Sequence, residues 1–369
     1  MADVKVTVER IHDVLAHPNA DKLEIAVISG EGGYQCCVQK GIFKPGDKCV
    51  YFPVDSVLPE PVESKIFGED AKVKLSKSRV KTIRLRGAIS QGLTVPLYLF
   101  AEYNYPIGYD LTERLGVKKF EPDQKGSPTF GQRAPKKNQN PNFNKYTDIQ
   151  HLKRYSQALV DRYVLAFEKI HGTNFRAGYV PSVCHSWLDR LRKVMGIFPN
   201  WEFVYGSHNV QLHRKNRGKD FYSREENVDV YTKTVEQYHI KDRLYPSEVI
   251  YGEIYGDKIQ KKYEYGCLPG ETKLLVFDVQ INGKFLDADD LIVWCEDRGF
   301  NHPPIVYRGM FDMHKLDDAV GGKSLIDDDC IKEGLVVRPM VESFGHMGRL
   351  VFKYINPEYL LQKDLSEYH

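Results

Sequence analysis

One lysine stands where a strand is expected to meet a glycine turn, a position that suits covalent chemistry. Residues 167–176 read FEKIHGTNFR, and an apolar run from Tyr163 to Phe167 precedes Glu168 and Lys169. The run predicts a buried strand that ends at Lys169, and Gly172 then provides a turn with space for a ligand. A lysine amine can attack phosphorus once it is deprotonated, so its pKa must fall from the usual value of about 10.4. Because a nearby metal cation, basic neighbours or burial would lower that pKa, Lys169 is the candidate nucleophile.

Four later segments place a charged or aromatic residue in or beside a predicted strand. They are YGEIYG (251–256), LVFDV (275–279), KEGLVVR (332–338) and RLVFKY (349–354). Two of them set a carboxylate next to glycine, Glu253 in the first and Glu333 in the third. The second carries Phe277 beside an acid, and the fourth carries Lys353.

Read in order with FEKIHGTNFR, these segments match the five signature motifs of covalent nucleotidyltransferases, and the chain resembles that superfamily. Its members are the ATP-dependent DNA and RNA ligases and the mRNA capping enzymes. Within it, EKIHGTN is similar to the nick-sealing RNA ligases, where histidine replaces the aspartate more usual in DNA ligases. The chain is identified as a member of the ATP-dependent RNA ligases that have an N-terminal OB domain before a minimal nucleotidyltransferase domain.

The resemblance implies a role for each motif residue. Lys169 would take AMP from ATP as a phosphoramidate, and Glu253 and Glu333 would hold Mg²⁺ or Mn²⁺ directly or through water. The other implied nucleotide contacts are Glu168 and the backbone of Ile170 at the adenine, Asn174 and Arg176 at ribose and phosphate, Phe277 stacked on the adenine, Glu253 near the nucleotide, and Lys353 at the α-phosphate. Magnesium prefers oxygen ligands and keeps several waters, so two glutamates suit it. A divalent cation and fixed lysines would offset the negative charge that develops during attack.

Three further residues have roles that the resemblance leaves open. The last motif usually holds two lysines one residue apart, but Val351 takes the first place here. Either Arg349 substitutes for that lysine, or the lysine is dispensable. His171 would either bond to the ribose or a metal-bound water, or only shape the turn. Gln150, which precedes the catalytic strand, is a candidate contact to the adenine edge.

Residues 1–118 read as a separate all-β domain, because short β-prone runs alternate there with turn sequences. HPNADKLEIAVISG (17–30) and IRLRGAISQGL (83–93) resemble the OB domains appended to some aminoacyl-tRNA synthetases. The open face of an OB barrel binds oligonucleotides. A run of lysines and arginines between residues 72 and 86 would attract phosphates without reading sequence. The alternative is a domain that only braces the catalytic part.

The predicted architecture is α+β: an N-terminal OB-fold β-barrel, then an ATP-grasp-like ligase nucleotidyltransferase domain of antiparallel sheets and helices. Residues 119–145 are rich in Pro, Asn, Gly and Lys and predict a linker, and residues 146–369 would form the nucleotidyltransferase domain. The strands expected in the first domain are 4–11, 23–29, 34–38, 48–54 and 80–85. The strands expected in the last domain are 163–168, 202–205, 248–253, 273–279, 334–338 and 349–354, and the helices are 186–195, 224–238, 287–298 and 357–364.

Composition limits the class of protein. Hydrophobic residues make up 42% and charged residues 28% of the 369 residues, as in ordinary globular proteins. The net charge is only +2, so nucleic acid would have to bind to a local basic surface. Seven cysteines without a CxxC pair argue against a disulfide framework or a zinc site and indicate a reducing compartment. No window approaches the roughly 20 apolar residues of a membrane span, so the expected location is cytoplasmic, with nuclear or organellar locations left open.

The sequence therefore predicts an enzyme that joins an RNA 3′-OH to an RNA 5′-phosphate, in RNA repair. The steps would be adenylylation of Lys169, transfer of AMP to the 5′-phosphate, and attack by the 3′-OH with loss of AMP. The expected partners are ATP and RNA ends, no membrane is expected, and the expected state is a monomer. One alternative is a DNA ligase or capping enzyme, whose C-terminal OB domain has no room after Lys353. The other is an RNA-binding protein with an inactive transferase domain, against which the intact Lys169, Glu253 and Glu333 argue.

Overall fold

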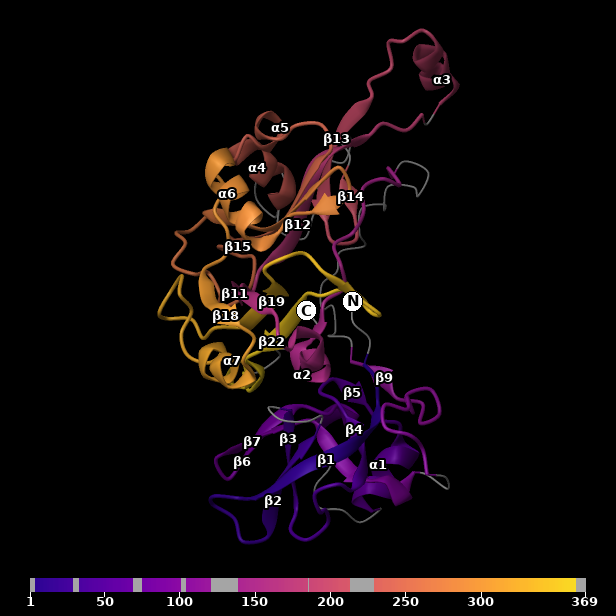
Figure 1. Ribbon diagram of the computed structural model, residues 1–369, viewed down its shortest axis with the longest axis vertical. Coiled ribbons are helices and arrows are strands. Elements are labelled where there is room, and N and C mark those ends of the chain that lie inside the picture. Colours follow the sequence, from indigo (N-terminus) through magenta and orange to yellow (C-terminus); the bar gives the residue numbers. More distant parts are fainter. Residues whose placement is uncertain are drawn as a thin grey trace.

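The computed structural model describes residues 4–28, 33–68, 75–100, 104–120, 139–184, 186–212 and 229–362. Figure 1 shows a smaller unit from the N-terminal part of the chain and a larger unit from the remainder. The architecture is α+β, as predicted. Within the described ranges, none of the helices is long and apolar enough to cross a membrane.

Five strands of the N-terminal unit form an antiparallel sheet that curls into a nearly closed barrel. Their order is β3 (Tyr34–Gln39), β2 (Leu23–Ile28), β1 (Thr7–Ala16), β4 (Lys48–Phe52) and β8 (Leu93–Pro96). The first half of β1 pairs with β4 and the second half with β2, with an irregular register between Ile11 and Asp13. Such an irregularity bends a strand and helps a sheet to close. Side chains alternate along β3, so that Tyr34, Cys36 and Val38 point into the barrel core.

A hairpin, a helix and a short strand pair complete this unit. The hairpin consists of β6 (Thr82–Leu85) and β7 (Ala88–Gln91). It reaches β3, because the Cys37 amide donates a hydrogen bond to Ser90 Oγ at 3.0 Å. The remaining elements are α1 (Glu60–Phe67), β5 (Ser56–Val57) and β9 (Lys118–Lys119), and β5 pairs with β9.

The cations expected between residues 72 and 86 do not form one continuous surface. Arg79 is buried, where its Nε donates to Asp55 at 2.7 Å and its guanidinium lies 3.7 Å from the centroid of the Phe120 ring. Arg84 forms an ion pair with Glu358 of the larger unit. The exposed members of the run within the described part are Lys77, Lys81, Arg84 and Arg86, and residues 71–74 lie outside that part. The expectation was therefore wrong for Arg79, whose charge is compensated inside the barrel.

Two sheets form the framework of the larger unit. The first has five strands in the order β10 (Gln150–His151), β22 (Phe352–Ile355), β19 (Gly334–Pro339), β11 (Tyr163–Lys169) and β18 (Ile305–Met310). The second has six strands in the order β14 (Gln211–Leu212), β13 (Trp201–Ser207), β12 (Thr173–Pro181), β15 (Glu248–Gly256), β16 (Thr272–Ile281) and β17 (Lys284–Phe285). Neighbouring strands are antiparallel, except that β10 runs parallel to β22. The prediction of antiparallel sheets is thus confirmed.

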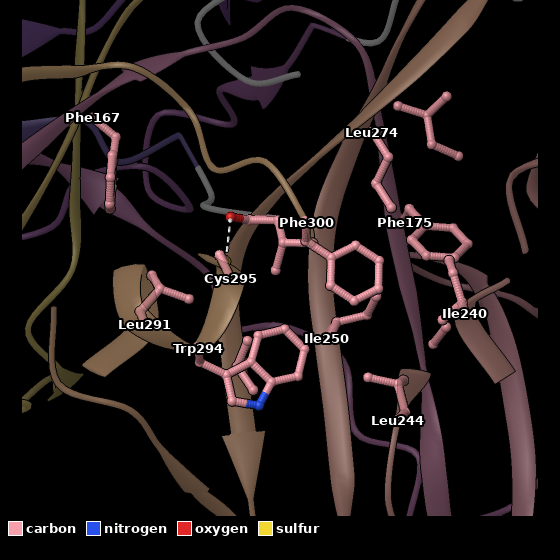
Figure 2. Packing of buried hydrophobic residues seen from close by; sticks show 14 of the residues in the cluster. Phe167, Phe175, Ile240, Leu244, Ile250, Leu274, Leu291, Trp294, Cys295 and Phe300 are labelled. Atoms are coloured by element: carbon pink, nitrogen blue, oxygen red, sulfur yellow. Dashed lines mark hydrogen bonds between the residues drawn. The ribbon is translucent and has the colours of Figure 1, made fainter. Parts of the chain in front are cut away.

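Helices cover one face of the six-stranded sheet and enclose the main core. They are α4 (Val230–Gln237), α5 (Ile240–Arg243) and α6 (Ala288–Arg298) (Figure 1). Figure 2 shows Phe175, Ile250 and Leu274 of the sheet beside Trp294 and Phe300, whose rings stack with centroids 5.7 Å apart. Fully burying side chains of this size contributes about 1.5–3 kcal/mol each. Because β11 also contributes side chains to this cluster, the core joins the two sheets.

The remaining helices have different environments. α2 (Leu152–Tyr155) and α7 (Met313–Val320) contribute buried leucines to a second cluster with the five-stranded sheet. α8 (Pro357–Leu360) follows the last strand. α3 (Trp187–Val194) lies at the tip of a two-stranded arm formed by β12 and β13, apart from the rest of the unit (Figure 1).

Several elements differ from those expected from sequence. The strand expected at 349–354 is divided, because Arg349 belongs to a hairpin of β20 (Phe344–Gly345) and β21 (Gly348–Arg349), whereas β22 begins at Phe352. The expected helix 224–238 begins at Val230, and residues 224–228 lie outside the described part. The sequence did not predict β12, β18 or α7. Residues 139–145 of the expected linker pack on the larger unit, with Asn140 and Phe143 buried.

A buried lysine joins the two units. Lys153 Nζ donates to the Gly33 carbonyl at 3.0 Å and to Gln91 Oε1 at 3.4 Å, both in the N-terminal unit. The same ammonium lies 5.4 Å from the ring centroid of Tyr354, a residue of β22. The barrel therefore docks beside the strand that also carries Lys353.

Candidate active site

The site begins at a turn that only glycine can make. β11 ends at Lys169 and β12 begins at Thr173, so the chain passes from one sheet to the other within three residues. A Cβ on Gly172 would lie 2.3 Å from the Ile254 carbonyl oxygen and 2.9 Å from Glu253 Cγ. Glycine at this position therefore allows β15 to approach the turn and brings Glu253 next to Lys169.

Lys169 is paired with a glutamate from a neighbouring strand. Its Nζ lies 2.7 Å from Glu333 Oε1, and Glu333 immediately precedes β19, which pairs with β11 so that Lys169 is opposite Gly334. Burial of the ammonium lowers the pKa of Lys169, but the carboxylates of Glu333 and Glu253 outweigh this effect, so the pKa lies above its usual value. Burial alone therefore does not generate the deprotonated amine, and the charge of the two carboxylates holds the proton on Lys169.

Two ionised carboxylates beside Lys169 would carry more negative charge than one lysine balances, so one of them resists ionisation. Burial and the nearby charge of Glu333 raise the pKa of Glu253 to about 8, against the opposing effect of Lys169. Glu333 Oε2 is buried and has no hydrogen-bond partner. Among the residues that the structure describes, no three His, Cys, Asp or Glu side chains form a metal cluster. One or two carboxylates, completed by water and substrate phosphates, are a usual donor set for Mg²⁺.

Tyrosines that the sequence analysis did not single out hold the turn around His171. The His171 amide donates to Tyr265 Oη at 2.9 Å, and the Tyr359 hydroxyl lies 3.2 Å from His171 Nδ1. The Tyr263 ring meets the imidazole edge-on, with centroids 5.0 Å apart. Burial, with the charge of Lys169, lowers the pKa of His171 to about 3, so the imidazole is neutral. In this arrangement His171 shapes the turn and faces Glu333 Oε2 at 3.9 Å from Nδ1.

Two of the expected ribose and phosphate contacts lie side by side on β12. Asn174 pairs in register with Glu253 on β15, so the two side chains share one face of the sheet. Asn174 Oδ1 is buried and has no hydrogen-bond partner. Arg176 lies on the same face, but its Nε and Nη1 already donate to the carbonyls of Ser207 and Phe143, at 2.9 Å and 2.7 Å. Asn174 thus offers a free acceptor at the site, and Arg176 has a bracing role as well.

Phe277 and Tyr146 form an aromatic wall on the face of the six-stranded sheet that carries Glu253. The β15–β16 ladder is irregular at this residue, because Tyr251 pairs with Asp278 and Gly252 with Val276. Phe277 is half-buried and meets the Tyr146 ring edge-on, with centroids 5.0 Å apart. Tyr146, which the sequence analysis did not include in the site, comes from the segment just before the strand that ends at Lys169. An exposed ring face in such a wall could stack on a base.

Arg349, the candidate substitute for a missing lysine, belongs to a buried ion network. Its Nε and Nη2 reach Glu342 at 2.5 and 2.7 Å, and its Nη1 reaches Asp278 at 2.5 Å. Arg338 contacts the same two acids, at 3.2 Å for Asp278 and 2.9 Å for Glu342. Tyr146 Oη donates to Asp278 Oδ2 at 2.8 Å. The network therefore lies directly behind the aromatic wall, and the charge of Arg349 is compensated there.

The other candidates differ in their distance from Lys169. Lys353 is buried and pairs with Val336 of β19, and Val336 in turn pairs with Phe167 of β11. Paired residues lie on the same face of a sheet, and so do residues two apart on one strand, so Lys353 is on the same face as Lys169. Gln150 lies on β10, three strand spacings from β11, which is about 14 Å. Glu168 projects from the opposite face, where its Oε2 accepts a hydrogen bond from the Leu325 amide at 2.8 Å and burial raises its pKa. Ile170 is buried among tyrosines.

The structure thus brings together Lys169, Glu253, Glu333, His171 and Asn174, whereas Gln150 lies farther away. The supporting tyrosines could not be found from spacing, because they follow the motif by about 90–190 residues and are positioned only by the fold.

Comparisons with known proteins agree with this arrangement. A family model for RNA ligase matches residues 162–355, and a model for an OB-fold domain matches residues 5–97. A Naegleria gruberi RNA ligase variant solved with ATP and Mn has a TM-score of 0.68 at 22% identity, covering 96% of this chain and 97% of that chain. An apo variant of the same enzyme has a TM-score of 0.71 at 21% identity, covering 98% of each chain. The structure of this enzyme with PPi has a TM-score of 0.70 at 20% identity, covering 97% of this chain and 98% of that chain. At these identities the likeness establishes the fold. No curated protein sequence matches the chain.

Proposed function

The chain belongs to the RNA ligase family, whose model matches residues 162–355, and we propose that it is an ATP-dependent RNA ligase that carries AMP covalently on Lys169. One observation carries this proposal: Lys169 Nζ lies 2.7 Å from Glu333, beside Glu253, where both sheets meet at the Gly172 turn. An amine held next to acceptors for a cation is what attack on a nucleotide phosphate requires.

The donor set fits a divalent cation. Glu253 and Glu333 would hold Mg²⁺ or Mn²⁺, directly or through water, because Glu333 Oε2 has no hydrogen-bond partner and Glu253 ionises with difficulty beside it. When bound, the cation would neutralise these carboxylates and so remove the electrostatic support for the protonated form of Lys169. Solved structures of Naegleria gruberi RNA ligase variants with ATP and Mn support this choice of nucleotide and metal.

We propose the following nucleotide contacts from the geometry. Phe277 stacks on the adenine, and Asn174 Oδ1 accepts a hydrogen bond from the ribose, because it is a buried acceptor beside Glu253. Lys353 offsets charge on the α-phosphate from the same sheet face as Lys169. Arg176 supports the phosphate side while it braces β12. Glu168 and the Ile170 backbone remain candidates at the adenine, as does Gln150 at its edge.

The reaction has three steps. Lys169 Nζ attacks the α-phosphorus of ATP, so a nitrogen–phosphorus bond forms and the bond from that phosphorus to pyrophosphate breaks. The RNA 5′-phosphate then displaces Lys169 and becomes RNA-adenylate. Finally, the 3′-OH of the other RNA end attacks the 5′-phosphorus, which forms the phosphodiester and releases AMP. We propose that this chemistry serves RNA repair and that one chain is sufficient for it.

The N-terminal barrel would hold the RNA. We propose residues 1–118 as an RNA-binding OB domain, residues 119–145 as a linker and residues 146–369 as the nucleotidyltransferase domain. Lys81, just before β6, and Arg86, in the turn between β6 and β7, are exposed and are the cations that we propose contact phosphates. The buried Lys153 contacts support a fixed position of the barrel beside β22.

The test is transfer of labelled AMP to the protein. Purified protein is incubated with Mg²⁺ and α-labelled ATP or GTP, and the same is done for Lys169→Ala and for Lys284→Ala, which removes an exposed lysine elsewhere. We expect labelling by ATP that is lost only in Lys169→Ala, followed by joining of 5′-phosphate and 3′-OH RNA ends. Labelling by GTP would indicate a capping enzyme instead. A folded protein, free of AMP at the start, that takes no label with any divalent metal would exclude the proposal.

A further inference from the structure

α3 is an exposed helix that packs on no hydrophobic core. It lies at the end of the arm formed by β12 and β13 (Figure 1), and none of its eight residues is buried. Trp187 is 72% exposed and Val194 is 85% exposed. Large apolar side chains at such exposure usually mark a contact surface.

The helix is stabilised locally rather than by packing. Ser186 and Asp189 form a capping box at its start, with the Asp189 amide donating to Ser186 Oγ at 3.1 Å. At its end, Gly196 adopts φ +70°, and the Ile197 amide donates to the Arg192 carbonyl at 3.0 Å. An isolated helix of this length is marginal in water, so caps at both ends hold a conformation that tertiary contacts do not. The sequence therefore specifies this helix although it contributes nothing to the core.

The helix is strongly two-sided. At about 100° per residue, its apolar side chains fall within an arc of about 120°. These side chains are Trp187, Leu188, Leu191, Val194 and Met195, all exposed. Arg190 and Arg192 fall on the two edges of this arc, about 40° beyond its ends, and Lys193 lies on the opposite side with Asp189. An apolar stripe with a cation on each edge is typical of helices that lie in a lipid interface.

We propose that α3 is a peripheral docking element for an anionic lipid surface. The apolar stripe would enter the boundary between headgroups and acyl chains, and Arg190 and Arg192 would contact the headgroup phosphates on both sides. The arm holds the helix away from the body, so a flat surface can reach it (Figure 1). Such contact lies on the bilayer surface and needs no spanning segment.

Other occupants fit less well. RNA would match the arginines but would leave the leucines and Val194 in water, because phosphates do not cover aliphatic side chains. A second copy of this helix would bring like charges together, and two helical turns bury far less than the roughly 800 Å² per partner of a stable interface. Charge complementarity along both edges of the stripe therefore favours a negatively charged bilayer.

The test is sedimentation of the full-length, nuclease-treated protein with vesicles. We expect binding to vesicles of phosphatidylcholine and phosphatidylglycerol, weaker binding at high salt, and little binding to pure phosphatidylcholine. Leu191→Ser with Val194→Ser should weaken binding by more than about tenfold, because both side chains leave the stripe. Arg190→Gln with Arg192→Gln should weaken vesicle binding by about 30-fold at low salt, because each arginine contributes roughly a fivefold gain in affinity through its attraction to the anionic surface.

A matched control distinguishes binding through α3 from nonspecific binding of exposed apolar side chains to vesicles. Tyr98→Ser removes an apolar side chain that is 78% exposed on the N-terminal unit and should leave vesicle binding unchanged. Adenylylation of Lys169 should be the same in all variants, which checks folding and leaves the ligase proposal independent of this one. Absence of vesicle binding, or binding that the α3 variants do not weaken, would overturn the proposal. Dimerisation that is lost in Leu191→Ser with Val194→Ser, without lipid binding, would assign the face to a second copy and equally overturn it.

Discussion

Replacing Asp278 with asparagine should test how the aromatic wall is held in place. Asp278 is fully buried, and its carboxylate contacts Arg338 at 3.2 Å, Arg349 at 2.5 Å and the Tyr146 hydroxyl at 2.8 Å. The amide of Asp278→Asn keeps the shape of the side chain but removes its charge. Two buried guanidinium groups would then share the single carboxylate of Glu342.

The expected loss of stability follows from the loss of one buried negative charge beside two buried guanidinium groups. Removing one partner of a buried ion pair costs about 3–5 kcal/mol of unfolding free energy, because a buried charge loses its compensation. Since Glu342 still compensates part of the charge, we expect Asp278→Asn to lower the free energy of unfolding by about 3 kcal/mol. The matched control is Asp289→Asn, which breaks the pair with Arg308 at 2.8 Å, where both side chains are more than half exposed. Exposed pairs contribute about 0–1 kcal/mol.

The assay is urea unfolding, followed by the fluorescence of tryptophans in the larger unit. A second readout is the affinity for ATP in Lys169 adenylylation, which we expect to fall in Asp278→Asn, because Tyr146 packs on Phe277 and would lose its hydrogen bond to a charged acceptor. If Asp278→Asn and Asp289→Asn cost the same free energy, the network does not stabilise the fold as argued. If stability falls without a change in ATP affinity, the network does not position the nucleotide wall.

Two further predictions test the turn and the barrel. Gly172→Ala should reduce the rate of Lys169 adenylylation by about 10- to 100-fold, because overpacking that costs about 1–3 kcal/mol would displace Glu253. The control, Gly321→Ala, has open space around the added methyl group and should leave the rate unchanged. Equal rates for the two variants would contradict the role of the turn. Deleting residues 1–118 should spare labelling of Lys169 by ATP but weaken sealing of RNA ends in a gel assay, and a truncated protein that seals as well as the full chain would show that the barrel does not bind RNA.

Local sequence was sufficient for much of the fold. Four of the five barrel strands overlap strands expected from sequence, and so do β11, β13, β15, β16, β19 and β22 of the larger unit, since alternating or apolar runs bounded by turn residues specify them locally. The fifth barrel strand, β8, was not expected. The α+β class, the barrel before the catalytic unit and the RNA ligase family also follow from sequence. β12 was missed, because Gly172 reads as a turn and its strand partners lie about 30–80 residues further on.

Candidate site residues could be named from motifs, but their electrostatics could not. The sequence analysis required a lowered pKa for Lys169, and the structure places two carboxylates beside it that raise the pKa. Arg349 and Arg79 read as available cations, yet both are compensated by buried acids. Neither partnership leaves a trace in spacing, because an ion pair depends on distance in space and on burial.

The sequence by itself determined which chemistry is present, in what order along the chain, and where many of the strands lie. It also determined α3, through caps that act over three to six residues. Only the tertiary structure decided which of those groups meet, which charges are already balanced and which faces stay uncovered. The physical reason is range: hydrogen bonding and side-chain periodicity act between near neighbours in sequence, whereas burial and Coulomb interactions depend on residues that folding brings together from distant parts of the chain.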